Sequence, residues 1–331
     1  MVKNLKEVMK TFSDEKKCID YLVQQRWNGN PVCPYCSGEK WYSIEGGKRF
    51  KCGNSACYKK YSVTVGTVFH ASNIPLSTWF AAMYLISAHK KGISSCQLAR
   101  DLGITQKSAW FVLHRIRESL KDKDSSLLSG TIEVDETYLG KKLGTEFKGY
   151  TEEQVAEMKA KSPRQYQLKS KGAVMALAQR QGKIKVKAFN EIDGQTAKDY
   201  IKENVQEGSK VYTDQSSMYR TGLEMYERES IRHTRPNPEF ARGDVHVNTV
   251  ESFWATFKRG KYGIYHNMSF KHLQAYCNEY AFRANTKQLK DGERFTLTLQ
   301  QLEGRLSYKM LVHGQSKEGG KESSQSTQKE G

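Results

Sequence analysis

The length, composition and charge of this chain narrow the classes of protein to which it can belong. At 331 residues it should form two or three domains, and the largest can bury an ample core. Its 53 Lys and Arg against 36 Asp and Glu leave a formal charge of +17, which favours a polyanionic partner, nucleic acid ahead of a membrane surface. No apolar run approaches the roughly 20 residues of a spanning helix, and the polar start lacks a signal-peptide core, so we expect no membrane role and a cytoplasmic location.

Residues 1–28 and 29–70 are predicted to form a helical segment and a small metal-dependent module. In the first range apolar residues recur at three- and four-residue steps, as in helices. The second contains short β-like pieces and two close cysteine pairs separated by fifteen residues. Four thiolates at this spacing are typical of a closed, tetrahedral, structural zinc site, so we expect a zinc ribbon rather than four unrelated thiols. The predicted zinc ligands are Cys33, Cys36, Cys52 and Cys57.

Residues 71–123 are predicted to contain a DNA-binding helix-turn-helix. In ISSCQLARDLGITQKSAWFVLHRI one apolar face is interrupted at Gly103, and the second helix has a polar start. Such a pair can insert its second helix in the major groove, although structural helix pairs share the pattern. The side chains expected to face DNA are Gln106, Lys107, Ser108 and Arg115.

Three acidic residues in separate segments predict a divalent-metal site. Asp135 and Asp214 each end a β-rich run, and Glu251 lies in an amphipathic helix. Carboxylates are the oxygen ligands that magnesium and manganese prefer, and a pair of such ions can catalyse phosphodiester cleavage and transfer. Singly, each acid could be a turn or solvated residue. Their strand, strand, helix order favours a shared catalytic site.

The helix around Glu251 offers further candidates. Asn248, one turn earlier, is an alternative third ligand or a helix cap, but an anionic carboxylate binds magnesium more strongly than an amide does. Lys258 lies two turns beyond Glu251 on the same side, where it can reach a phosphate. Arg259 and Lys261 extend this basic edge toward DNA. Glu136 is a lesser candidate, because a regular strand points it to the face opposite Asp135.

Residues 128–290 are expected to form an α/β domain, in which strands are followed by mixed strands and helices. Between its first two acids, residues 141–171 are predicted to be an irregular, Lys-rich insertion that lies along phosphates or is simply solvated. Residues 291–313 form a C-terminal extension. Residues 314–331 have no apolar anchor and should be a disordered tail.

The segments TIEVDETYLG, VYTDQSSMY and HVNTVESFWATFKRGKYGIYH resemble the DDE insertion-sequence transposases of the ISXO-like group, which carry an N-terminal zinc ribbon. The resemblance runs from about residue 15 to residue 285. It implies a ribonuclease-H-like catalytic domain, preceded here by the zinc ribbon and the helix-turn-helix. It also implies magnesium or manganese at Asp135, Asp214 and Glu251, with cleavage at the ends of the element and strand transfer into target DNA.

The partners implied are double-stranded DNA, as terminal inverted repeats and target, and further copies of the chain. Pairing two DNA ends favours a homodimer or larger assembly, associated with the nucleoid in the bacterial cytoplasm. Two alternatives stay open: a DNA-binding regulator descended from a transposase, and a metal-dependent nuclease that does not join strands. The presence of all three acids together with Lys258 favours the enzyme.

Overall fold

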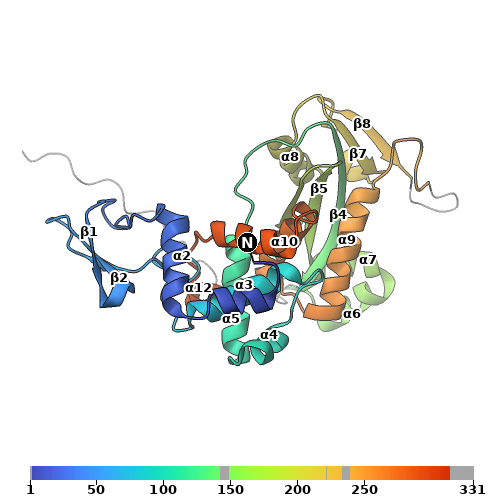
Figure 1. The fold of residues 1–331 in the computed structure, drawn as a ribbon. Coiled ribbons are helices and arrows are strands. Elements are labelled where there is room, and N and C mark those ends of the chain that lie inside the picture. The colour runs from blue at the N-terminus through green and yellow to red at the C-terminus, as the bar shows by residue number, and fades with distance from the viewer. Residues whose placement is uncertain (1, 142–148, 221, 233–238, 314–331) are drawn as a thin grey trace, which may run out of the picture.

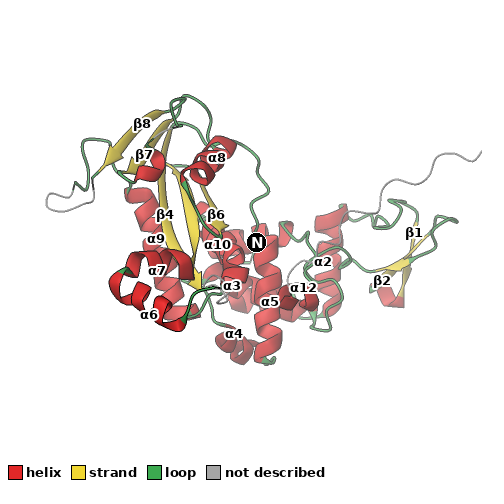
Figure 2. Cartoon of the chain, turned by 180° about the vertical axis from the view of Figure 1, so that it is seen from behind, coloured by secondary structure: helices red, strands yellow, loops and turns green. Residues whose placement is uncertain are grey.

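The computed structural model describes residues 2–141, 149–220, 222–232 and 239–313 (Figure 1). A small β module and an α/β domain lie at opposite ends of the molecule, with helices between them (Figures 1 and 2). The tail predicted for residues 314–331 lies outside the described residues. Among the helices that are described, none has the length and apolar character needed to cross a bilayer.

The N-terminal helices form as the apolar spacing predicts. Helix α1 (Leu5–Thr11) and helix α2 (Glu15–Trp27) begin after Asn4 and Asp14, whose side chains accept hydrogen bonds from backbone nitrogens of the first turn. An antiparallel sheet of β1 (Trp41–Ile44), β2 (Arg49–Cys52) and β3 (Lys60–Tyr61) follows. Trp27 packs edge-on against two aromatic rings of this sheet and so joins it to α2.

The predicted helix pair is present, and a longer helix precedes it. The three helices are α3 (Leu76–Ala88), α4 (Ser95–Leu102) and α5 (Gln106–Ser119). Helix α4 ends at Gly103, whose φ of 63° is readily adopted by glycine, and the Thr105 side chain caps α5. The predicted apolar face of the pair packs into the core of this helical region.

The α/β domain is built on a five-stranded sheet with the order β6-β5-β4-β7-β8. Its first strand, β4, is central: it pairs antiparallel with β5 and parallel with β7. The strands are β4 (Thr131–Lys141), β5 (Lys171–Gln179), β6 (Ile184–Phe189), β7 (Lys210–Asp214) and β8 (Glu227–Ile231). Strand β8 has no counterpart among the predicted strands.

Helices cover both faces of this sheet. Because side chains alternate along a strand, Val174 and Ala176 of β5 pack toward α9 and α10, whereas Met175 and Leu177 pack toward α8. The covering helices are α8 (Gly194–Asn204) on one face, and α9 (Asn248–Gly260) and α10 (Phe270–Asn285) on the other. The C-terminal extension adds α11 (Asp291–Gln300) and α12 (Tyr308–His313).

The prediction of an irregular insertion between the first two acids is wrong for the described part of that segment. It contains α6 (Glu152–Lys161) and α7 (Pro163–Ser170). Helix α6 starts in a capping box, in which Thr151 and Gln154 bond reciprocally to each other's backbone. This local signal was present in the sequence TEEQ and could have identified the helix.

Buried charges join the helical region to the α/β domain. Arg117 of α5 donates to Glu279 of α10 at 2.7 Å, and both side chains are almost wholly buried. Glu279 also accepts hydrogen bonds from Tyr265 at 2.6 Å and from Arg283 at 2.7 Å. Both oxygens of Glu279 are paired, which makes burial of its charge tolerable, although Nη2 of Arg117 and Nε of Arg283 have no hydrogen-bond partner in the described part of the chain.

Candidate active site and metal sites

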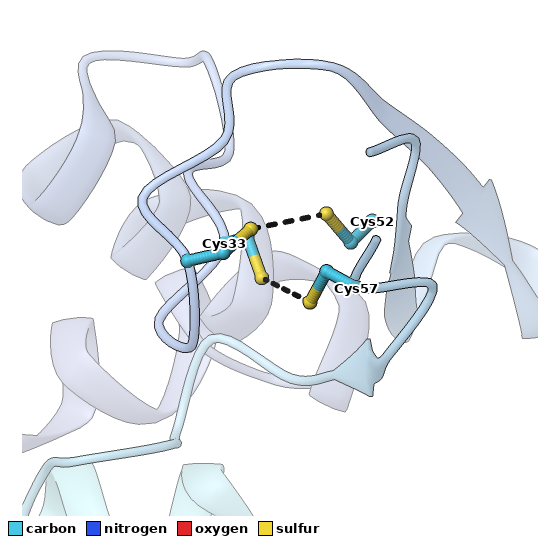
Figure 3. Close-up of side chains that lie close together, drawn as sticks. Cys33, Cys52 and Cys57 are labelled. Carbon is cyan, nitrogen blue, oxygen red and sulfur yellow. Dashed lines mark hydrogen bonds between the residues drawn. The ribbon is translucent and has the colours of Figure 1, made fainter. Parts of the chain in front are cut away.

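The four predicted zinc ligands meet in the N-terminal module. Their sulfur atoms all lie within 4.8 Å of one another, although the cysteines come from two separate turns. The Sγ atoms of Cys33 and Cys57 are 3.8 Å apart, and those of Cys36 and Cys52 are 3.5 Å apart (Figure 3). The backbone nitrogen of Asn54 donates to the sulfur of Cys52. Four cysteine sulfurs, with no other His, Cys, Asp or Glu in the cluster among the described residues, fit a closed structural zinc site.

Strand register brings the first two acids together. Strands β4 and β7 run parallel, with Glu133 beside Tyr212 as their last paired positions. Continuing this register by two residues places Asp135 beside Asp214, where β7 ends. Strand β4 continues to Lys141, so the prediction that Asp135 ends its strand is wrong. Residues two apart share a face, so both carboxylates project to the side of the sheet covered by α9. Acids that are 79 positions apart in the chain become neighbours.

The pKa of Asp135 indicates that other negative charges lie close to its carboxyl group. Burial, followed by the charges of Glu136, Asp214 and Glu251, raises the pKa of Asp135 to about 8. Glu251 lies 116 residues away in sequence, yet its charge acts on Asp135. A carboxyl group in this condition is one that a divalent cation would stabilise as the anion. The donor set therefore fits a hard divalent metal, although the described carboxylates are not gathered as tightly as the four sulfurs.

Glu133 attaches helix α9 to the strand that carries Asp135. Its side chain is fully buried and accepts hydrogen bonds from the backbone nitrogens of Thr249, at 2.6 Å, and Val250, at 3.1 Å. It also accepts from the Thr249 hydroxyl at 2.9 Å. A carboxylate at the start of a helix satisfies unpaired backbone donors and interacts favourably with the helix dipole. The sequence does not predict this role, because no local pattern links the two segments.

Arg180 neutralises the buried carboxylate. Its Nε donates to Glu133 at 2.8 Å, and its Nη2 lies 2.9 Å from the His246 ring and donates to the His246 carbonyl oxygen at 3.1 Å. His246 comes two residues before α9. Arg180, at the end of β5, therefore fixes the approach to α9 from a third segment of the chain.

Helix α9 separates the two candidates for the third ligand. Glu251 lies on the side of α9 from which its charge raises the pKa of Asp135. Asn248 instead lines a cavity on another side of the helix. Lys258 is exposed two turns beyond Glu251, and Arg259 is exposed on the side of Asn248. Lys261 is half-buried, and burial, reinforced by Lys171 and Lys258, lowers its pKa.

The four helix-turn-helix residues predicted to face DNA do not all reach the surface. Gln106 and Lys107 are exposed at the start of α5, and Ser108 is partly exposed. Arg115 is only 2% exposed, so its prediction as a DNA-contacting side chain is wrong. Its guanidinium donates to the carbonyl oxygen of His70 at 2.5 Å and lies over the rings of Trp79 and Phe111. The apolar spacing of the helix pair did not distinguish a buried arginine from an exposed one.

Glu136 occupies the opposite face of the sheet from Asp135, as the alternation of β4 predicts. It accepts a hydrogen bond from the Tyr219 hydroxyl at 2.5 Å. Tyr219 is fully buried in the core beneath α8. Glu136 still raises the pKa of Asp135 through its charge, but it belongs to the packing of the other layer.

A central strand that carries one acid, a parallel neighbour that ends in a second acid, and a covering helix with a third define a ribonuclease-H-like domain behind a zinc-ribbon module. Comparison with known families agrees. Residues 127–285 match the ISXO2-like transposase domain, and residues 13–60 match the transposase zinc-ribbon domain. These matches identify residues 127–285 and 13–60 as the catalytic and zinc-ribbon domains of DDE insertion-sequence transposases of the ISXO-like group.

One curated relative supports the same family. An uncharacterized protein in the transposable element ISH50 of Halobacterium salinarum is 29% identical over 262 residues, which cover 76% of this chain and 84% of the relative. No solved structure matches. The zinc-ribbon match begins before α2, which packs against that module.

Proposed function

We propose that this transposase binds the terminal inverted repeats of its element, cleaves the DNA at their ends and joins the freed ends to target DNA. The observation that carries the proposal is the side-by-side placement of Asp135 and Asp214, with the charge of Glu251 acting on the same point. The family match supports the reaction class. The basic charge of the chain supports the polyanionic substrate.

In this proposal Asp135, Asp214 and Glu251 hold magnesium or manganese, and Lys258 binds a phosphate beside them. When bound, the two divalent ions supply an activated oxygen nucleophile and stabilise the leaving oxygen. The chain's own residues hold the site: Glu133 and Arg180 fix the first turn of α9 against β4. Asn248 remains the alternative third ligand, but its place on the cavity side of α9 favours Glu251.

The same proposal assigns zinc to Cys33, Cys36, Cys52 and Cys57, where it is structural. Gln106, Lys107 and Ser108 contact DNA from the start of α5, and Arg259 and Lys261 contact it from the end of α9. Synapsis of two element ends requires at least two copies of the chain, so we propose a homodimer or larger assembly on DNA. The site of action is the nucleoid in the bacterial cytoplasm.

The test uses purified full-length protein and a duplex that carries the inverted repeat found beside the gene. We expect magnesium-dependent cleavage and joining by the native protein, and neither by Asp135→Ala or Asp214→Ala. Asp199→Ala, which changes an exposed acid on α8, should behave as the native protein does. Intact cleavage by Asp135→Ala would rule the proposal out.

The third ligand and the alternatives are separated in the same assay. If Glu251 binds metal, Glu251→Gln abolishes cleavage, whereas Asn248→Ala retains most of it. The reverse pattern would assign the role to Asn248. DNA binding without cleavage by the native protein would identify a regulator, and cleavage without joined products would identify a nuclease.

A further inference from the structure

A basic cavity lies where the helical region meets α9 of the catalytic domain. It measures about 920 Å³ and is lined by four segments of the chain, three of which supply exposed cations. Lys90 and Lys91 come from the segment between α3 and α4, Lys287 comes from the segment between α10 and α11, and Arg259 comes from α9. All four side chains are exposed. Among the described residues that line it, none is Asp or Glu.

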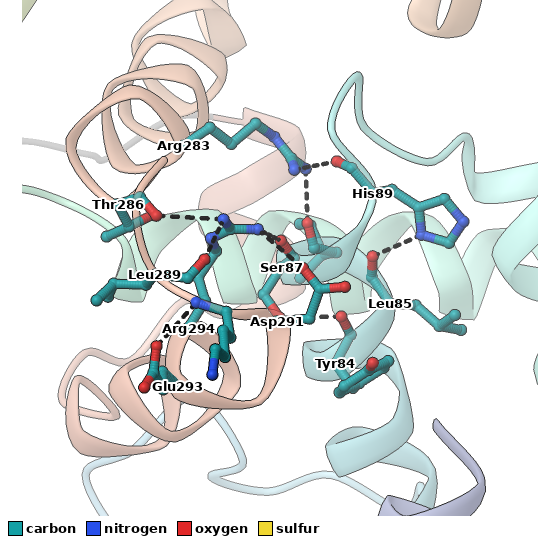
Figure 4. Close-up of polar contacts among 12 residues, drawn as sticks. Tyr84, Leu85, Ser87, His89, Arg283, Thr286, Leu289, Asp291, Glu293 and Arg294 are labelled. Atoms are coloured by element: carbon teal, nitrogen blue, oxygen red, sulfur yellow. Dashed lines mark hydrogen bonds and ion pairs between the residues drawn. The ribbon is translucent and has the colours of Figure 1, made fainter. Parts of the chain in front are cut away.

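Two further arginines that line the cavity, Arg283 and Arg294, already have partners within the protein. Arg283 donates to the carbonyl oxygens of His89 and Ile86, and Arg294 donates to that of Ser87 at 2.8 Å (Figure 4). These carbonyls end helix α3, so two guanidinium groups satisfy acceptors that the helix leaves unpaired. Both arginines also interact with acids, Arg283 with Glu279 and Arg294 with Asp291.

The four exposed cations are in a different condition. Within the described part of the chain, none of Lys90, Lys91, Lys287 and Arg259 belongs to an ion pair; Arg259 makes a 3.3 Å hydrogen bond to Thr256. Concentrating positive charge in a concave surface costs self-repulsion unless an anion offsets it. Ser252 and Thr256 add hydroxyl groups on the same side of α9, and such groups commonly contact phosphate oxygens.

The position of the cavity identifies its anion. On one side of helix α9, the charge of Glu251 acts on Asp135. On another side, Asn248 and Ser252 line the cavity, and each lies within one helical turn of Glu251. A DNA strand whose reacting phosphate lies at the acids must continue past this helix. We propose that the cavity binds the phosphodiester backbone of the DNA strand that leads away from the reacting phosphate. This inference rests on the proposed function and adds a second, non-catalytic contact to it.

The location also explains why segments of both parts build the cavity. Its walls come from the helical region and from the catalytic domain, which the buried pair of Arg117 and Glu279 holds together. A strand bound there would touch both parts at once. The cavity would thereby align DNA held by the helix-turn-helix with the acids.

The test measures DNA affinity over a range of salt concentrations for Lys91→Gln/Lys287→Gln. Both side chains are exposed, so the fold should be kept, and an unchanged Tm verifies this. Each phosphate contact with duplex DNA contributes about 0.9 to the slope of log K against log salt. Loss of two contacts should therefore lower the slope by about 1.8, with weaker binding at low salt.

The matched control is Lys202→Gln/Lys210→Gln, which removes the same charge from exposed positions on α8 and β7. Its slope should equal that of the native protein. An unchanged slope for the cavity variant, or an equal fall for the control, would overturn the inference. Failure of the native protein to bind DNA would also overturn the inference. So would a cavity that binds only a small anion: inorganic pyrophosphate would then raise the Tm of the native protein but not of the cavity variant, while both proteins bind DNA equally. Native protein that binds DNA with the expected slope but does not cleave it would contradict the proposed function alone.

Discussion

Glu133 accepts a hydrogen bond from the backbone nitrogen of Thr249 at 2.6 Å, across 116 positions of the chain. Glu133 lies two residues before Asp135, and Thr249 lies two residues before Glu251. The bond therefore sets the distance between two of the proposed metal ligands without involving either. Rigid support of this kind is what a two-metal site needs, because its ligands must be held in a productive geometry.

Replacing Glu133 should weaken metal binding more than it weakens the fold. In Glu133→Gln an amide NH₂ replaces one acceptor oxygen, so a donor of the first turn of α9 or of Arg180 loses its partner. We expect the magnesium concentration for half-maximal cleavage to rise about 10–100-fold, the usual effect of losing a group that orients a ligand. Glu227→Gln, an exposed change on β8, serves as the control. A lower Tm with an unchanged magnesium midpoint would show that Glu133 is only structural.

Stability of the metal-free protein should depend on Asp135. The pKa of Asp135 is about 8 in the folded protein, above the ordinary value near 4. The folded state therefore binds this proton more tightly than the unfolded state does. The resulting stabilisation is present in full below about pH 4 and is lost as the pH rises toward 8. Asp135→Asn should remove this loss. In thermal scans without metal, the Tm of the variant should fall less between pH 5 and pH 8 than the Tm of the native protein. Each kcal/mol of difference in the free energy of unfolding corresponds to about 2–4 °C in Tm.

Magnesium supplies the second half of that test. At pH 8 it should raise the Tm of native protein and leave Asp135→Asn almost unchanged, because binding to the folded state alone stabilises it. An equal rise in both proteins would place the metal elsewhere.

The buried ion pair between α5 and α10 should be costly to break. Glu279→Gln leaves Arg117 and Arg283 with uncompensated charge, so the free energy of unfolding should fall by about 3–5 kcal/mol. The exposed change Glu203→Gln should cost less than about 1 kcal/mol. Denaturant unfolding measures both. Equal effects would mean that the buried pair does not hold the two parts together.

Protonation of Glu279 should lower the stability of the protein at low pH. Burial opposes its ionisation, but Arg117 and Arg283 hold its pKa at about 2. Because this pKa lies below the ordinary value, the stabilisation is present above about pH 4 and is lost as pH falls toward 2. In Glu279→Gln the free energy of unfolding should therefore depend less on pH between about pH 4 and pH 2 than it does in the native protein.

Removal of the zinc site should unfold one module only. The core of the ribbon is small, so Cys52→Ser should abolish stoichiometric zinc and expose the amides of β1 and β2 to hydrogen exchange. The sheet of the catalytic domain should stay protected. Cys96→Ser, an exposed cysteine outside the cluster, should keep its zinc. Stable protection of β1 and β2 in zinc-free protein would contradict this expectation.

Much of the fold was predictable because its signals are local. Apolar spacing identified the helices around Leu22 and Leu98, and β-rich runs identified the strands that carry Asp135 and Asp214, although β4 continues six residues beyond Asp135. The insertion was misjudged at Thr151, where a capping box was overlooked. Strand β8 was missed because ERESI has one buried apolar residue, and only pairing with β7 makes it a strand.

By itself the sequence determined the composition of the sites: the spacing of four cysteines, two acids on strands, and a third acid on a basic helix. These depend on covalent spacing and on the periods of strands and helices. The tertiary structure alone decided that Glu133 anchors α9, that Arg115 is buried, and that Lys91 and Lys287 face one cavity with Arg259. Each depends on contacts between segments far apart in the chain, where hydrogen bonding and burial, not spacing, determine which side chains meet.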